Sequence, residues 1–194
     1  MIMKLSGKVI LTDCDGVLVD WEYGFTKWMR QHGYVPVVHG EYDIATTFGL
    51  EKSEAKKLVR HFNESAAMGW LPALRDAVKY VRKLHEEHGF IFHCITSLSL
   101  DEHAAKLRKK NLEALFGKTV FEKIVCLDTG ADKDEALEPY RDTGCIWLED
   151  KPENADLGLE LGLDSYLISH PHNDYYGGDA DRVQNWKELY EMIV

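Results

Sequence analysis

Two aspartates one residue apart, Asp13 and Asp15, end an apolar run and are followed directly by Gly16. The run before them, from Val9 to Leu11, is apolar and β-branched, which predicts a buried strand. Ligands of open α/β sheets bind beyond the carboxyl ends of the strands, where this pair would lie. Two carboxylates this close repel each other unless a cation lies between them or one holds a proton. By itself, the stretch is as typical of a solvated acidic turn as of a metal or phosphate site.

Further polar residues follow later predicted strands or lie in the loops beside them, and each type suits one part of phosphoryl transfer. A carboxylate can attack phosphorus and carry the phosphoryl group, while a second carboxylic acid protonates the leaving oxygen and then deprotonates water. Hydroxyl and backbone N–H groups bind phosphoryl oxygens, a lysine offsets their charge, and a late acidic pair completes an oxygen shell for Mg²⁺. In chain order these residues are Asp13 and Asp15, Thr96 and Ser97, Lys133, and Glu149 and Asp150.

Each of the later features also has a simpler explanation when it is taken singly. Thr96 and Ser97 are residues that commonly cap a helix, and a lone lysine such as Lys133 is usually solvated. Glu149 and Asp150, which precede Lys-Pro, suit the N-terminus of a helix. Only their ordered occurrence at successive strand ends favours a phosphoryl-transfer site.

Predicted strands and helices alternate along most of the chain, which indicates an α/β fold with a doubly wound parallel sheet. The segment 20–72 interrupts this alternation and is predicted to be a small, mainly helical insert above the strand ends. The core domain would then comprise residues 1–19 and 73–194. The expected strands are 9–11, 90–95, 123–127, 145–148 and 166–168, and the expected helices are 20–32, 53–62, 73–89, 100–115, 152–162 and one from about 182.

The composition of the 194 residues is that of a globular protein, with 45% apolar and 29% charged residues. A net charge of −10 disfavours duplex nucleic acid or an anionic membrane as a partner, but it leaves room for a small phosphorylated substrate bound through a cation. The four cysteines match no zinc or redox spacing, which indicates free thiols. Because residues 1–8 contain no apolar signal segment and no run is long enough to span a membrane, a cytoplasmic location is expected.

The ordered set of motifs resembles that of the haloacid dehalogenase superfamily of phosphotransferases. The resemblance covers most of the chain, and it implies a central first strand, with the second and third strands on one side and the fourth and fifth on the other. It implies Mg²⁺ as the cofactor. Carried over by position, it implies Asp13 as nucleophile, Asp15 as general acid and base, Lys133 as the stabilising lysine, Thr96, Ser97 and Gly16 at the phosphate, and Asp13, Asp15 and Asp150 at the metal, with Asp15 contributing its backbone carbonyl. Glu149 stands where the family often has aspartate, so both direct and water-mediated contact with the metal stay open.

Three runs, 15–22, 95–97 and 149–152, are similar to those of the 5′(3′)-deoxyribonucleotidases. This resemblance implies Mg²⁺-dependent dephosphorylation of nucleoside monophosphates beneath a small helical cap that contacts the base through aromatic rings. Trp21 resembles such a base contact. Phe48 and Trp70, expected in loops, are further candidates to face the substrate because a flat ring can stack on any base. Either a monomer or a homodimer is compatible with a compact cap.

Other functions share part of this pattern of residues. A phosphatase for sugar phosphates or another small metabolite would keep the same chemistry, and a catalytically silent binding module would keep only the fold. A receiver-type domain is disfavoured because no aspartate ends the second predicted strand, and a dehalogenase would not need Asp15. The stretch 170–178 is predicted to be a polar surface loop, although its position after the fifth strand allows it to border the site.

Overall fold

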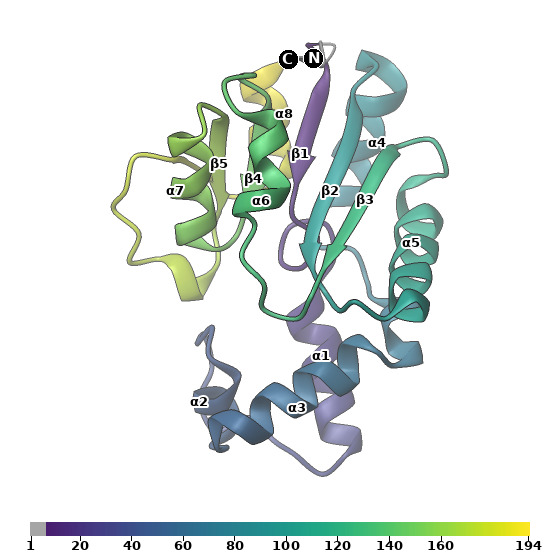
Figure 1. Cartoon of the computed structure of the whole chain (residues 1–194), viewed down its shortest axis with the longest axis vertical. Helices are drawn as coiled ribbons and strands as arrows, with labels where there is room; N and C mark the ends of the chain where they lie inside the picture. The colour runs from purple at the N-terminus through teal and green to yellow at the C-terminus, as the bar shows by residue number, and fades with distance from the viewer. Residues whose placement is uncertain (1–6) are drawn as a thin grey trace.

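The computed structural model describes residues 7–194 and contains one sheet of six parallel strands with helices on both faces (Figure 1). Residues 1–6, part of the stretch in which the sequence shows no signal segment, lie outside this range. The order β3-β2-β1-β4-β5-β6 confirms the predicted doubly wound sheet and the central place of the first strand. The strands are β1 (Val9–Thr12), β2 (Ile91–Ser97), β3 (Phe121–Leu127), β4 (Ile146–Glu149), β5 (Asp164–Ile168) and β6 (Asp181–Val183).

The sixth strand is the main departure from the predicted elements. A helix was expected from about Arg182, but residues Asp181–Val183 form β6, which pairs in parallel with β5. The helix α8 begins later, at Trp186, where the Asn185 side chain accepts a hydrogen bond from the backbone of Glu188. A strand of three residues is too short to show a two-residue period, so the sequence pattern could not reveal it.

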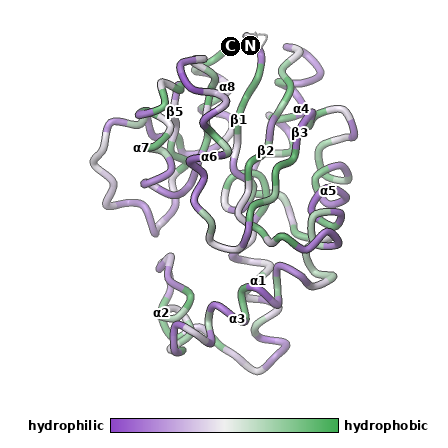
Figure 2. The backbone as a smooth tube through the Cα atoms, in the orientation of Figure 1, coloured by the Kyte–Doolittle hydropathy of each residue, from purple (hydrophilic) through white to green (hydrophobic). Residues whose placement is uncertain are grey.

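Alternate residues of the central strand face opposite layers of helices, as the pleat of a strand requires. Ile10 packs in the cluster that contains residues of α4 (Ala77–His88), α5 (Glu102–Phe116) and α8 (Trp186–Ile193). Val9 and Leu11 pack in the second cluster, with residues of α6 (Asp134–Leu137), the 3₁₀ helix Glu138–Tyr140 and the neighbourhood of α7 (Pro152–Glu160). Figure 2 shows the hydrophobic colour that results along β1 and β2. Both faces of the sheet are thus buried, which explains the continuous apolar strands.

The insert, residues 20–72, lies beyond the carboxyl ends of the strands (Figure 1). It comprises α1 (Trp21–Gln31), α2 (Ile44–Phe48), α3 (Lys52–Asn63) and the 3₁₀ helix Ala66–Trp70. Its centre is aromatic: the ring of Phe25 lies 4.6 Å from Trp21, 5.8 Å from Phe48 and 5.2 Å from Phe62, measured between centroids. Phe25, Phe48 and Phe62 belong to the same hydrophobic cluster as Ile10 of β1, so this aromatic packing is continuous with the core on one face of the sheet.

The chain enters and leaves the insert at one place. The backbone N–H of Asp20 donates to the carbonyl of Pro72 at 2.9 Å, and the N–H of Leu74 donates to the carbonyl of Leu18 at the same distance. The two connecting segments therefore lie side by side. Within residues 7–194, no helix has both the length and the apolar character needed to cross a membrane.

Trp186 ties the last helix to the loop after β1 and should contribute strongly to stability. Its side chain is fully buried, and its indole N–H donates to the carbonyl of Val17 at 2.8 Å. We expect Trp186→Ala to lower the free energy of unfolding by about 3–5 kcal/mol, measured by chemical denaturation, because it leaves a large cavity and an unpaired carbonyl. Trp70→Ala, at a ring that is 73% exposed, is the matched control and should change it by no more than about 0.5 kcal/mol. Equal losses would contradict the assignment.

Candidate active site

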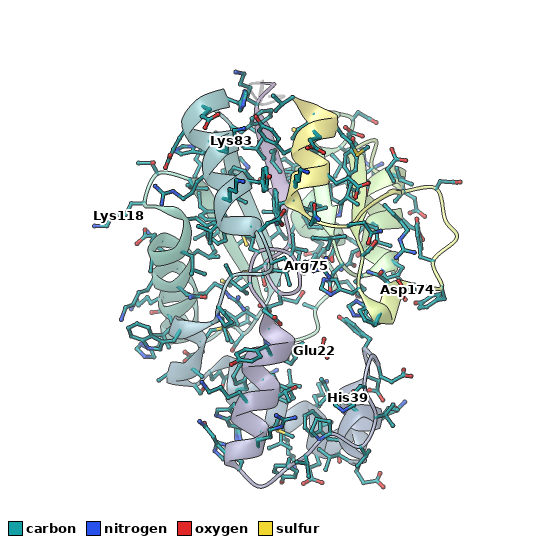
Figure 3. All side chains as sticks on the ribbon, turned by 180° about the vertical axis from the view of Figure 1, so that it is seen from behind. Glu22, His39, Arg75, Lys83, Lys118 and Asp174 are labelled. Atoms are coloured by element: carbon teal, nitrogen blue, oxygen red, sulfur yellow. The ribbon has the colours of Figure 1, made fainter. Side chains whose placement is uncertain are left out.

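A cavity of about 440 Å³ opens at the carboxyl ends of the strands and is lined by residues of both the sheet and the insert. Figure 3 labels two residues on its wall: Glu22, at the start of α1, and Arg75, in the segment that returns to the sheet. The cavity contains all the sequence-predicted chemical residues. They are Asp13, Asp15, Gly16, Thr96, Ser97, Lys133, Glu149 and Asp150.

A buried lysine joins two of the predicted acids. The ammonium of Lys133, which is 2% exposed, lies 2.8 Å from Oδ1 of Asp13 and 2.6 Å from Oε1 of Glu149. Burial opposes the charge of Lys133, but the two carboxylates outweigh it and raise the pKa of the lysine. Lys133 is therefore held protonated beside Asp13, although it comes from the β3–α6 loop and Asp13 follows β1.

Glu149 is saturated by protein donors. Its Oε1 accepts from Lys133 and from the side-chain amide of Asn154, at 2.6 and 2.7 Å, while its Oε2 accepts from the backbone N–H groups of Asp150 and Lys151. Burial opposes the charge of Glu149, but Lys133 and these hydrogen bonds lower its pKa. The carboxylate thus orients Lys133 and the β4–α7 turn. Because both of its oxygens already accept hydrogen bonds from the protein, water-mediated contact with a metal is favoured over direct contact.

Three carboxylates gather closely enough to share a metal ion. One oxygen from each of Asp13, Glu149 and Asp150 lies within 4.8 Å of the others, and all three residues are buried. Burial raises the pKa of Asp13, and the neighbouring carboxylates add to this effect although Lys133 opposes it. Burial also raises the pKa of Asp150, to about 6. A divalent cation would keep both carboxylates ionised, and hard oxygen ligands of this kind fit Mg²⁺.

Gly16 leaves the space that Asp150 occupies. Its φ of +74° lies in the left-handed region that favours glycine, and a Cβ atom there would stand 2.5 Å from Oδ2 of Asp150. The loop after Asp13 can therefore approach Asp150, which follows β4, only with glycine at position 16.

The two hydroxyl residues that end β2 have different partners. Oγ1 of Thr96 is buried in the cavity wall and has no hydrogen-bond partner in the part of the chain that the structure describes. Because a buried hydroxyl is rarely left unpaired, this oxygen fits a ligand atom such as a phosphoryl oxygen. Ser97 instead donates to the carbonyl of Ala131 at 2.8 Å and so fixes the loop that carries Lys133.

Asp15 is paired with an arginine that the sequence pattern does not predict. Arg108 of α5 is fully buried, and its guanidinium contacts both carboxylate oxygens of Asp15, at 2.7 and 2.9 Å. It also donates to the thiol sulfur of Cys14 at 2.9 Å. The sequence does contain one indication of this arginine. Arg108 lies four residues from both Ala104 and Leu112, on the core-facing side of α5, where an apolar side chain is expected.

The three aromatic residues predicted to face the substrate lie in different surroundings. Trp21 lines the cavity, and its indole N–H donates to Asn63 at 3.0 Å. Phe48 is buried inside the insert, because residues Ile44–Phe48 form a helix rather than the expected loop. Trp70 is exposed and lies below the ammonium of Lys110, 4.6 Å from its ring centroid, so neither residue lines the cavity.

The structure adds wall residues that the predictions did not include. Tyr42 of the insert lines the cavity. His170 and His172 do so too, although the stretch 170–178 was predicted to be a polar surface loop, with only a place at the border left open. A sequence pattern could not place these residues, because loop residues without periodicity carry no information about which wall they face.

Comparisons with known proteins identify the fold. No family model matches the chain. An uncharacterized 32.4 kDa protein of Enterobacteria phage T4 is 24% identical over 194 residues, which covers 95% of this chain and 69% of that protein.

Solved structures match nearly the whole chain. A haloacid dehalogenase-like hydrolase from Streptococcus pneumoniae is 17% identical, with a TM-score of 0.67 and coverage of 96% of this chain and 98% of that one. CbbY from Rhodobacter sphaeroides, in complex with phosphate, is 18% identical with a TM-score of 0.61 and coverage of 94% and 96%. A D,D-heptose 1,7-bisphosphate phosphatase from B. bronchiseptica, with magnesium and phosphate, is 11% identical with a TM-score of 0.57 and coverage of 96% and 97%. The chain therefore has the haloacid dehalogenase fold.

The pairing of Glu149 with Lys133 should make a large contribution to stability. We expect Glu149→Gln to lower the free energy of unfolding by about 3–5 kcal/mol, because it removes one charge of a buried ion pair and leaves part of the lysine charge without its partner. Chemical denaturation would measure the loss. Glu138→Gln, which weakens the exposed pair with Arg141, is the matched control and should leave the midpoint unchanged. An unchanged midpoint for both variants would refute this role of Glu149.

Proposed function

We propose that the protein is a Mg²⁺-dependent phosphomonoester hydrolase that acts through an aspartyl-phosphate on Asp13. The observation that carries the proposal is the convergence of Asp13, Lys133, Asp150 and the unpaired hydroxyl of Thr96 in one cavity. Together they supply a nucleophile, positive charge, a metal-binding acid and a donor for a phosphoryl oxygen. Two structures of the same fold hold phosphate, one of them with magnesium, which supports the same use of the site here.

The proposed reaction has two halves. In the first, a carboxylate oxygen of Asp13 attacks phosphorus, the ester P–O bond breaks, and Asp15 protonates the departing oxygen. In the second, Asp15 takes a proton from water, whose oxygen attacks phosphorus, so that inorganic phosphate leaves and Asp13 is regenerated. Mg²⁺ bound at Asp13, the Asp15 carbonyl and Asp150 would neutralise charge on the phosphoryl oxygens. Lys133 adds a second positive charge at the nucleophile, and Asp15 has to give up part of its pairing with Arg108 before it can hold the proton that it donates.

We further propose that residues 20–72 form the substrate-selecting cap and that the substrate is a nucleoside monophosphate. Trp21 and Tyr42 place two aromatic rings on the cavity wall, where either can stack on a base. A sugar phosphate is the second candidate, because three acids on the same wall, Asp20, Glu22 and Glu41, offer acceptors to the hydroxyl groups of a sugar.

The first test is phosphate release from nucleoside monophosphates and sugar phosphates. We expect release by the wild type that requires Mg²⁺, is abolished by EDTA and restored by added Mg²⁺, and falls at least about 1000-fold in Asp13→Asn, since the amide cannot act as the nucleophile. Glu135→Gln, in the exposed first turn of α6, is the matched control and should retain full activity. Absence of release from every compound would contradict the proposed function and favour the binding-module alternative.

The second test asks whether the insert reads a base. Trp21→Ala and Tyr42→Ala should each lower kcat/KM for nucleoside monophosphates by about 5- to 160-fold, because stacking on an aromatic ring contributes about 1–3 kcal/mol per base. Release from glycerol phosphate, which has no base, should change by less than about threefold.

Trp70→Ala, whose ring lies outside the cavity, controls for the loss of any tryptophan. Equal losses on both kinds of substrate would rule out base recognition and leave the sugar-phosphate candidate.

A further inference from the structure

The segment from His170 to Asn173, named here the histidine segment, contacts two parts of the candidate active site. It follows β5 and contains the short 3₁₀ helix Pro171–Asn173. The imidazole Nε2 of His170 lies 2.7 Å from the carbonyl of Gly16, and the guanidinium of Arg75 lies 3.4 Å from its Nδ1. A carbonyl can only accept, so Nε2 carries the proton, and Nδ1 accepts from Arg75. One end of the segment is thus tied to the loop after Asp13.

The other histidine contacts the carboxylate of Asp150. Nε2 of His172 lies 3.3 Å from Oδ2 and 3.1 Å from the backbone carbonyl of Asp150. Both oxygens accept, so Nε2 must donate. The side-chain amide of Asn173 donates to the same carbonyl at 2.8 Å. The histidine segment therefore contacts both the backbone carbonyl and the carboxylate of Asp150.

Two rings hold the imidazole of His172 in this orientation. The ring of His170 stacks on it with centroids 5.1 Å apart and planes 10° from parallel. The ring of Tyr42, from the insert, approaches to 5.2 Å. Only 11% of the His172 side chain is exposed, so few other orientations are open to it.

We propose that His172 is a positioning residue for the metal, which directs the Asp150 carboxylate by donating a hydrogen bond to Oδ2. The proposal rests on the proposed function, because it assumes that Asp150 binds the cation. Anchoring the segment needs no histidine at 172, since His170 and Asn173 already bond to the backbone of Gly16 and Asp150. The N–H of His172 is shared between the backbone carbonyl and Oδ2 of Asp150, so one of its two contacts reaches a carboxylate oxygen of a cavity-lining acid. Hydrogen bonds of this kind to a ligating side chain typically change metal affinity 10- to 100-fold.

The experiment measures metal binding directly, without substrate, by electron paramagnetic resonance of Mn²⁺ and competition with Mg²⁺. We expect His172→Phe, which keeps a ring between His170 and Tyr42 but removes the donor, to weaken Mn²⁺ binding at least about tenfold. His172→Gln places an amide N–H near the position of Nε2 and should stay within about threefold of the wild type. Asp150→Asn should lose most binding, which identifies the site.

His88→Phe is the matched control, because His88 bonds to Tyr190 among residues that are absent from the cavity wall. It should bind Mn²⁺ like the wild type. Thermal unfolding of every variant would show that it is folded.

The outcomes separate this inference from the proposed function. Wild-type affinity in His172→Phe, or an equal loss in His172→Phe and His172→Gln, would overturn the positioning role. Failure of the wild type to bind Mn²⁺ would overturn it as well. If the wild type binds Mn²⁺ with the expected ranking of variants but releases no phosphate from any ester, the positioning role stands and the hydrolase proposal fails.

Discussion

The candidate active site depends on one buried lysine between two carboxylates. Lys133 lies in the β3–α6 loop, yet it contacts Asp13 after β1 and Glu149 at the end of β4. An unpaired charge could not remain ionised at this burial, so the three groups require one another. The parallel order of the strands is what brings them to one edge of the sheet. Neighbouring features follow from this pairing, because Glu149 also fixes the turn that carries Asp150.

Much of the fold and the central chemical residues could be predicted from the sequence, for a physical reason. Buried parallel strands are continuous apolar runs, and polar residues that end them must meet at one edge, so the sequence correctly predicts that Asp13, Thr96 and Asp150 lie together. The pattern failed where geometry is not periodic. Val183 lies in a strand too short to recognise, and Phe48 turned inward because its loop is a helix.

The residues around that chemical centre were missed for a different reason. Arg108 occupies a position where helical spacing predicts an apolar side chain, and only the three-dimensional contact with Asp15 explains a charge there. His170, His172 and Tyr42 lie in irregular segments, whose sequences do not determine which way they face. The polar residues at the strand ends can thus be recognised from the local sequence. The residues that contact and orient them come from distant parts of the chain.

The two connections between the sheet and the insert lie side by side, which allows the insert to be replaced as one segment. Asp20 and Pro72 are joined by a hydrogen bond, so the loop ends of the insert are already as close as the ends of a tight turn. None of the six strands is drawn from residues 20–72. The topology of the sheet therefore does not depend on the length or the sequence of the segment 20–72. Residues 20–72 can therefore be exchanged as one segment while Asp13, Lys133 and Glu149 keep their positions at the edge of the sheet.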